Sequence, residues 1–317
     1  MTTESTIELT DIARDFGAVC SAPATLADYT TFRLGGRCSL LIECPLPMQL
    51  EAVVKALHER HAGFVLIGGG SNLLVADAGV NEIVVRYLTD DAEIQRCGDE
   101  LTVSGATSLD ELAAFAVAAG LGGLVNTTGI PGTVGGAIVG NAGAFGWQVG
   151  DALVWVDLLD RQGERRRAAP AAIGFSYRNS GLKQTGEIVL AARFRLPEVT
   201  PQELGTQRNE ILHLRASKHP DLGVDASAGS FFRNIEPTSA AARRQAAGWF
   251  LEQAGAKAMG VGGAAVFHKH ANIIIKGRPD CTARDVLELS RRMAAAVGDR
   301  FGLELVREVT LLGEMGA

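Results

Sequence analysis

Glycine is concentrated in one stretch of this 317-residue chain, and that concentration most limits what the chain can fold into. The sequence contains 38 glycines, about 12% of the chain, whereas roughly 7% is usual. Eleven of them fall between Gly120 and Gly150, and they do not recur at every third residue, which excludes a collagen-like fibre. Because glycine lets a backbone approach its neighbours closely, the stretch predicts loops packed against a ligand or another part of the chain.

The composition indicates two globular domains and argues against a nucleic-acid partner. The length suits two domains, since one domain usually contains about 100–200 residues. Hydrophobic residues make up 47% of the chain and charged residues 21%, which allows sizeable cores and excludes disorder. The net charge of −6 gives no basic excess for binding phosphates, and 6% aromatic residues indicate no platform for stacking bases.

Targeting and redox signals favour a cytoplasmic protein. Residues 1–15 carry early acidic residues and no apolar core, so we expect no signal peptide. The most membrane-like uncharged run, Leu112 to Val125, is shorter than the roughly 20 residues that cross a bilayer, so we expect no membrane insertion. The five cysteines are odd in number and include no C-x-x-C, which predicts neither a disulfide framework nor a zinc site.

The predicted helices and strands follow no regular βαβ order, which favours an α+β fold. A capping box at Ser108–Glu111 begins a helix that ends before Gly120. Two prolines within residues 197–205 mark a boundary, so we predict a leader at 1–27, a domain at 28–198 and a second domain at 203–317. Further elements are predicted as helices at 48–61, 109–119, 201–216, 239–254 and 283–301, and as strands at 64–67, 188–196 and 303–312.

Two glycine loops are candidate ligand sites. The first, Gly68 to Asn72, follows a predicted strand, and its glycines can turn backbone N–H groups toward an anion. It matches neither the P-loop motif nor the dinucleotide fingerprint G-x-G-x-x-G. The second, Gly129 to Ala144, is dense enough in small residues to admit a flat or phosphorylated ligand. A plain tight turn and backbone-on-backbone packing are the alternatives, but two such loops suggest a nucleotide cofactor held by another fold.

Several motifs extend this pattern across nearly the whole chain. They are YTTFRLGG at 29–36, IGGGSNLL at 67–74, GIPGTVGGAIVGNAGAFG at 129–146, SAGSFFRN at 227–234, KHAN at 269–272 and REV at 307–309. From Ala27 to Gly313 the set resembles the UDP-N-acetylenolpyruvoylglucosamine reductase family, also known as the MurB or UDP-N-acetylmuramate dehydrogenase family. No long insertion interrupts the second domain, so the chain resembles the shorter subtype of that family.

The resemblance implies a fold, a reaction and a partner. The fold is an FAD-binding domain of the vanillyl-alcohol oxidase (PCMH) type followed by a smaller α+β substrate-binding domain. Hydride passes from NADPH through FAD to the enolpyruvyl ether of UDP-N-acetylglucosamine, giving UDP-N-acetylmuramate. This is a cytoplasmic step of peptidoglycan and cell wall synthesis, and it serves cell shape and division. We expect a monomer whose partner is the nucleotide sugar. Another flavin oxidoreductase of this fold, acting on a different sugar or alcohol, and a non-catalytic nucleotide-sugar binder are the alternatives.

Hydride addition to an enolpyruvyl group builds negative charge on the adjoining carbon and carboxylate, which the protein must stabilise and then protonate. The resemblance assigns Arg178 to the active site, Ser230 to protonation and Glu308 to electrostatic and proton management. The planar fork of arginine suits a carboxylate. From the residues alone, Ser230 is expected in a glycine-flanked loop, and a surface arginine, a loop or capping serine and an exposed strand carboxylate stay open. Strand parity places Glu304 and Glu308 on one face.

The same motifs imply the binding residues. For FAD they are Arg33, Gly68, Gly69, Gly70, Ser71, Asn72, Gly129, Ile130, Pro131, Gly132, Gly135, Gly136, Asn141, Ala142 and Gly143. For the substrate they are Tyr177, Arg233 and Asn234. Arg233 stands where the family often has lysine, Arg307 stands where it commonly has proline, and residues 123–128 also depart from the family pattern. His268 and His270 have the spacing of one strand face, but no third ligand is evident, so we expect no metal.

Overall fold

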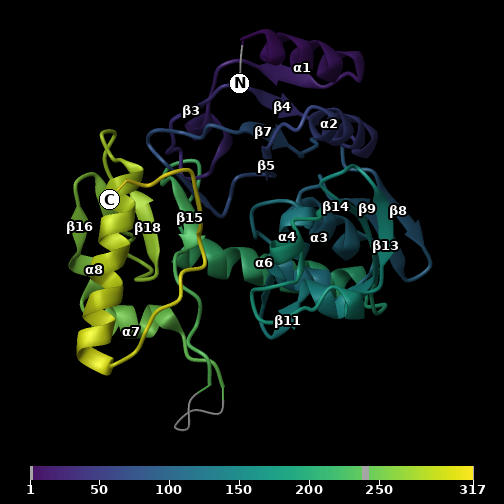
Figure 1. Ribbon diagram of the computed structural model, residues 1–317. Helices are drawn as coiled ribbons and strands as arrows, with labels where there is room; N and C mark the ends of the chain where they lie inside the picture. The colour runs from purple at the N-terminus through teal and green to yellow at the C-terminus, as the bar shows by residue number, and fades with distance from the viewer. Residues whose placement is uncertain (1–2, 238–242, 317) are drawn as a thin grey trace. The chain divides into compact units, whose positions relative to one another are not determined.

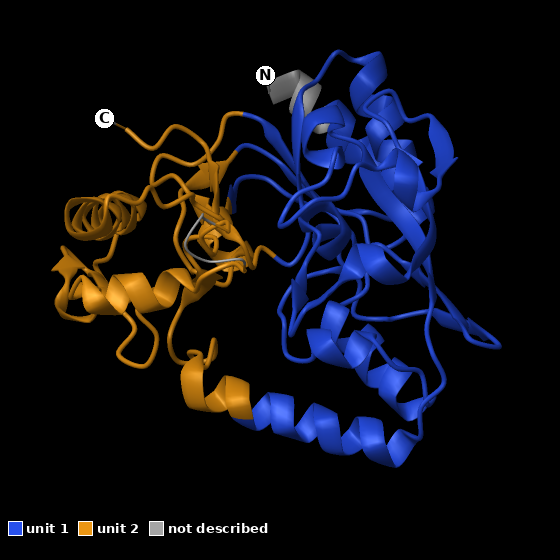
Figure 2. Ribbon diagram, turned by 90° about the horizontal axis from the view of Figure 1, so that it is seen from below, with its two compact units in different colours: residues 1–24, 39–69, 82–213 blue, residues 25–38, 70–81, 214–317 orange. Residues whose placement is uncertain are grey.

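The computed structural model describes residues 3–237 and 243–316, which form two compact units (Figure 2). Unit 1 comprises residues 1–24, 39–69 and 82–213, and unit 2 comprises residues 25–38, 70–81 and 214–317. Each unit has its own hydrophobic core. The domain boundaries predicted after residue 27 and at 198–203 stay predictions, because the two units interleave along the chain.

The first sheet of unit 1 is built mainly from parallel strands. Its order is β1 (Val19–Ser21), β4 (Leu41–Glu43), β7 (Ile83–Arg86) and β5 (Phe64–Ile67). Only β1 runs antiparallel to its neighbour. The helices α1 (Thr3–Asp15) and α2 (Pro47–Glu59) pack on each other. Leu50, Val53 and Leu57 of α2 are buried in the core of this sheet, as their helical spacing predicts.

The second sheet of unit 1 is antiparallel. Its order is β13 (Arg165–Ala168), β12 (Leu153–Leu159), β14 (Ile188–Arg195), β9 (Glu100–Ser104) and β8 (Ile94–Cys97). The helices α3 (Leu109–Ala118) and α4 (Val134–Gly140) share one core with it. The predicted cap of α3 is present, since Ser108 Oγ accepts a hydrogen bond from the Glu111 N–H at 3.5 Å.

Short elements and one long helix complete unit 1. Two buried residues of α6 (Pro201–Lys218), Leu204 and Ile211, pack with Val117 and Val125. The assignment to units changes within α6, after His213. The short elements are β10 (Gly143–Ala144), β11 (Trp147–Gln148), α5 (Leu182–Thr185), η2 (Leu124–Thr127), η3 (Val149–Ala152) and η4 (Pro170–Ala172).

Unit 2 is an antiparallel sheet with helices on it. The sheet order is β15 (Ser227–Ser230), β18 (Ile273–Lys276), β17 (Ala264–Val266) and β16 (Gly260–Val261). The helix α8 (Ala283–Phe301) packs along this sheet and against α7 (Ala247–Gln253) (Figure 1). A separate parallel pair joins β19 (Thr310–Leu312) to β6 (Leu73–Val75). The remaining elements are β2 (Ala24–Thr25), β3 (Arg37–Cys38), η1 (Leu26–Tyr29) and η5 (Ala256–Ala258). The unit assignment changes within β2, between its two residues.

Three local predictions need correction. The strand predicted at 303–312 is wrong over most of its length, because only Thr310–Leu312 is a strand, so strand parity says nothing about Glu308. The helix predicted at 239–254 begins at Ala247, and residues 239–242 lie outside the described part of the chain. His268 and Lys269 lie in a turn between β17 and β18, so they share no strand face with His270. Among the described residues, no helix has the length and apolar character to cross a membrane.

Candidate active site

The two glycine loops of the sequence meet in unit 1. A Cβ added to Gly68 would lie 2.7 Å from Thr133 Oγ1, and a Cβ added to Gly69 would lie 3.3 Å from the Gly132 Cα. Glycine at these two positions therefore allows one loop to lie directly on the other. The spacing of 64 residues between Gly68 and Gly132 gave no sign of this contact.

The place where the loops meet offers unsatisfied hydrogen-bond donors. Within the described residues, the backbone N–H groups of Gly68, Gly69 and Gly132 have no acceptor. The hydroxyl of Thr107, which is 0% exposed, also lacks a partner there. Thr107 belongs to the same cluster, because its carbonyl accepts the Val134 N–H at 2.9 Å. Thr107 is buried, and buried donors are normally paired. Together with the three partly buried N–H groups, its hydroxyl makes this surface fit a ligand rich in acceptor atoms, as FAD is.

Gly68→Ala should destabilise this junction. The added Cβ would press on Thr133, whose Oγ1 caps α4 by accepting the Gly136 N–H at 3.1 Å. Loss of a helix cap costs about 1 kcal/mol. We therefore expect urea unfolding of the holoprotein to give a free energy of unfolding about 1 kcal/mol lower for the variant. Gly63→Ala is the matched control, because a Cβ there would meet nothing within 4 Å. Equal stability of the two variants would contradict the close contact between the loops.

Arg178 lies at the tip of a tight turn in unit 1. Ser176 and Asn179 close the turn by two backbone hydrogen bonds, at 3.0 and 3.1 Å. Arg178 has a φ of +53°, a conformation that costs a side chain free energy. Its Cζ lies 5.5 Å from the centre of the Tyr177 ring. Strained residues cluster at functional sites, which supports a function for this turn.

Asn141 and Ser180 anchor that turn to the glycine segment. Asn141 is 1% exposed, and its Nδ2 donates to the Ser176 carbonyl at 2.9 Å. Its Oδ1 accepts the Gly150 N–H at 3.1 Å. The Ser180 hydroxyl donates to the Val139 carbonyl at 2.7 Å. The Asn141 side chain is predicted to contact FAD. Its amide instead bonds to protein groups, and in doing so it holds the Arg178 turn in place.

Ser230 ends a strand with a glycine bulge, rather than lying in a loop as expected. Ser227 pairs with Ile275 and Ser230 with Ile273, so two residues of β15 face one residue of β18. Gly229 occupies the bulge with a φ of +76°. Such bulges re-aim the next side chain and are frequent beside active sites. The Ser230 hydroxyl makes no hydrogen bond within the described residues.

The structure brings the Glu308 segment beside the Ser230 segment in unit 2. The Glu308 N–H donates to the Phe231 carbonyl at 2.8 Å, and the Arg233 N–H donates to the Val306 carbonyl at 2.8 Å. Asn72 Nδ2 donates to the Glu308 carbonyl at 3.2 Å. Two of the three predicted catalytic residues therefore lie on neighbouring segments of one unit.

Ser227 and Asn272 support this arrangement and were not singled out from the sequence. The buried Ser227 hydroxyl donates to the Ile274 carbonyl at 2.8 Å and accepts the Gly229 N–H at 3.1 Å. The Asn272 side chain pairs with both backbone groups of Phe232, at 2.9 and 2.7 Å. Their presence in the SAGSFFRN and KHAN motifs was the only sequence signal.

Among the predicted binding residues, Asn234 and Arg33 are hydrogen-bonded to the protein itself, whereas Arg233 has an unsatisfied donor within the described residues. Arg233 Nε is buried without a partner in the described part of the chain, which suits a ligand contact. Asn234 Oδ1 instead accepts the Ala247 N–H at 3.2 Å, at the start of α7. Arg33 Nη2 donates to the carbonyls of Leu222 and Gly223, at 2.5 and 3.2 Å.

The other predicted cofactor residues lie in the two loops or at their ends. The Gly135 N–H donates to the Gly105 carbonyl at 2.9 Å. A Cβ on Gly143 would lie 2.1 Å from the Trp147 carbonyl oxygen, and a Cβ on Gly70 2.1 Å from the Tyr29 carbonyl oxygen. Close backbone packing therefore accounts for glycine at 70 and 143. Ala142 accepts the Val149 N–H at 2.9 Å. Ile130, Pro131 and Ser71 complete the loops.

A pair of histidines lies among basic residues in unit 2. The His219 and His270 rings are 5.5 Å apart. Burial lowers the pKa of His219 to about 4, with Arg215 and His270 adding to the effect. Burial also lowers the pKa of His270. Burial among basic residues thus favours the neutral form of both rings.

Comparison with known proteins defines first the class and then the family. Residues 40–169 match the model of an FAD binding domain, so the chain contains the domain of a flavoprotein. Residues 220–312 match the model described as UDP-N-acetylenolpyruvoylglucosamine reductase, C-terminal domain. The UDP-N-acetylenolpyruvoylglucosamine reductase of Heliobacterium modesticaldum is 34% identical over 308 residues, covering 97% of this chain and 95% of that protein. The chain belongs to the UDP-N-acetylenolpyruvoylglucosamine reductase family.

Other relatives agree across the full length. The enzyme of the same name from Moorella thermoacetica is 37% identical over 292 residues, covering 91% of this chain and 92% of that protein. The crystal structure of the Thermus caldophilus reductase is 31% identical and superimposes with a TM-score of 0.75, covering 93% of this chain and 99% of that one. The expected fold class, an FAD-binding domain of the PCMH type followed by an α+β domain, is confirmed.

Proposed function

We propose that this protein reduces the enolpyruvyl ether of UDP-N-acetylglucosamine to UDP-N-acetylmuramate, with FAD as its cofactor and NADPH as the hydride donor. This is a cytoplasmic step of peptidoglycan synthesis. Family membership over nearly the whole chain supports the reaction. The observation that carries it at residue level is the bulged end of β15, where Ser230 lies beside the segment of Glu308. The shorter subtype and the monomeric state stay predictions.

The glycine junction of unit 1 is our proposed site for FAD. The N–H groups of Gly68, Gly69 and Gly132 and the Thr107 hydroxyl supply donors for its phosphate and ring acceptors. When bound, FAD would supply the redox chemistry that carries a hydride from NADPH to the substrate.

Arg178 is assigned to the substrate carboxylate. Hydride addition at the terminal carbon places charge on the adjoining carbon and carboxylate, and a guanidinium fork stabilises that charge through two parallel hydrogen bonds. The closed turn and its anchor at Asn141 fix the backbone that carries Arg178 before substrate binds. A fixed donor needs no reorganisation during the reaction.

Ser230 is assigned to protonation of the adjoining carbon. Its hydroxyl proton moves to that carbon, and Glu308 and solvent restore the proton on the oxygen. A serine hydroxyl is a weak acid, so a neighbouring group must assist it. Glu308 is the carboxylate residue whose own N–H donates to the Phe231 carbonyl, next to Ser230. Tyr177, Arg233 and Asn234 are assigned to the nucleotide sugar. The strongest candidate is Arg233, whose Nε has no partner among the described residues.

The test is NADPH consumption by the purified yellow protein. We expect fast consumption only with the enolpyruvyl nucleotide sugar and little with oxygen alone. Equal turnover with oxygen alone would indicate an oxidase of the same fold. A colourless protein that binds the nucleotide sugar would indicate the non-catalytic alternative.

A further inference from the structure

The helix α6 carries an arginine on its buried stripe. Leu204 and Ile211, four residues before and three residues after Arg208, are buried against Val117 and Val125. This spacing places all three α6 residues on one face. The Arg208 side chain is only 18% exposed, and a charge so placed is retained only with a partner.

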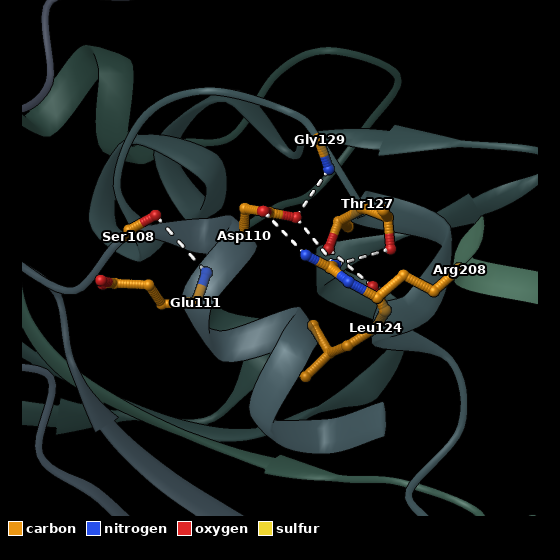
Figure 3. Close-up of polar contacts among 8 residues, drawn as sticks. Ser108, Asp110, Glu111, Leu124, Thr127, Gly129 and Arg208 are labelled. Carbon is orange, nitrogen blue, oxygen red and sulfur yellow. Dashed lines mark hydrogen bonds and ion pairs between the residues drawn. The ribbon is translucent and has the colours of Figure 1, made fainter. Parts of the chain in front are cut away.

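That partner is Asp110, in the first turn of α3. Arg208 Nη1 and Nη2 donate to Asp110 Oδ1 and Oδ2, both at 2.9 Å, and Nη1 also donates to Thr128 Oγ1 at 3.1 Å. Asp110 Oδ1 accepts the Gly129 N–H at 2.7 Å. Figure 3 shows that these groups converge at the start of the second glycine loop. One carboxylate thus joins α6, α3 and the loop.

The loop from Gly129 to Gly132 is tied to α3 at both ends. Gly129 is held by Asp110, and the Gly132 carbonyl accepts the Leu109 N–H at 3.0 Å. Gly129 has a φ of +70°, so its backbone is set in a conformation that favours glycine. Gly132 is also the residue that lies against Gly69. The position of the first α3 turn therefore sets the position of the Gly132 N–H, which finds no acceptor within residues 3–237 and 243–316.

We propose that Asp110 and Arg208 are positioning residues that hold the Gly129–Gly132 loop ready for FAD. The inference rests on the proposed function, because it takes this loop to contact the cofactor. A two-point arginine–carboxylate pair fixes both direction and distance. Holding the loop in its bound geometry removes the cost of ordering it when FAD binds.

The test measures the FAD dissociation constant of the holoprotein, from flavin fluorescence released on dilution. For Asp110→Ala we expect a rise of about tenfold, which corresponds to about 1.4 kcal/mol. Arg208→Met keeps the bond between Asp110 and Gly129, so we expect a smaller rise of about threefold to fivefold. Asp157→Ala is the matched control, because Asp157 forms a similar two-point pair with Arg167, at 2.7 and 2.8 Å, on the sheet of unit 1. The control should change the constant less than about twofold.

A purely structural role predicts a different outcome. In that case Asp110→Ala would lower the free energy of unfolding. The FAD dissociation constant and the flavin midpoint potential of Asp110→Ala would nevertheless equal those of the control Asp157→Ala, and this result would overturn the inference. If Asp110→Ala does not fold, Arg208→Met and Arg208→Lys decide by the same measurement. Gly132→Val tests the underlying site. If it leaves FAD affinity unchanged, the proposed cofactor site fails, whereas weak binding by Gly132→Val and normal binding by Asp110→Ala rejects only the positioning role.

Discussion

Ser230→Ala is expected to lower kcat by about 10²–10⁴-fold, because a positioned proton donor contributes a factor of that order. The variant should fold normally. Within the described residues the hydroxyl makes no hydrogen bond, and alanine fits the end of a strand. We therefore expect the free energy of unfolding to change by less than about 0.5 kcal/mol. Loss of turnover without loss of stability would separate a chemical role from a structural one.

Rapid mixing divides the effect between the two half-reactions. Bleaching of the flavin absorbance by NADPH should keep its normal rate in Ser230→Ala, while its recovery on addition of the enolpyruvyl substrate should be slow. Ser217→Ala is the control, since the exposed Ser217 hydroxyl donates to the Leu214 carbonyl of its own helix, at 2.8 Å. Wild-type rates in both half-reactions would show that Ser230 is not the proton donor.

Arg178→Lys is expected to lower kcat/KM by about 100-fold, since hydrogen bonds to charged groups are worth about 1.5–3 kcal/mol and a point charge cannot replace a planar fork. The loss should appear in kcat as well as in KM, because negative charge on the carboxylate group grows in the transition state. Lysine keeps the positive charge, so the variant tests geometry rather than charge.

The control for Arg178→Lys is another arginine of unit 1. Arg195 forms a surface ion pair with Glu100 and its side chain is 63% exposed. Arg195→Lys should leave kcat/KM and stability nearly unchanged, since surface ion pairs are worth about 0–1 kcal/mol. If Arg178→Lys behaved like Arg195→Lys, the carboxylate role of Arg178 would be wrong.

Strong local signals made several elements predictable from the sequence. The helix α8 spans Ala283–Phe301 as predicted, because Thr282 and Asp285 form a capping box and Gly302 ends it in the left-handed conformation. The strand β5 also has its predicted bounds, Phe64–Ile67. In each case residues within a few positions fix the ends.

Elements set by distant partners were not predictable. The segment from Leu303 to Val309 reads as a strand, yet its pairing with the Ser230 segment is limited to an isolated bridge between Phe232 and Arg307. Val306 is 55% exposed there. Only Thr310–Leu312 finds a full partner, in β6, more than 200 residues earlier in the chain.

In the candidate site, too, the local motifs were predictable from the sequence and the contacts between distant residues were not. Motifs identified the glycine loops and Ser230 as individual segments, but not the contact of Gly69 with Gly132 or the bulge at Gly229. Asp110 and Arg208 are 98 residues apart. Asp110 falls within the capping box at Ser108–Glu111, but neither residue belongs to a motif that carries the family resemblance, so only the fold joins them.

The central claim, reduction of an enolpyruvyl nucleotide sugar by this flavoprotein, is tested most directly by a single turnover without oxygen. The holoprotein is bleached with one equivalent of NADPH and then mixed with the enolpyruvyl ether of UDP-N-acetylglucosamine. The account predicts full recovery of flavin absorbance and one equivalent of UDP-N-acetylmuramate. Recovery that occurs only when oxygen is admitted, with the nucleotide sugar unchanged, would contradict it.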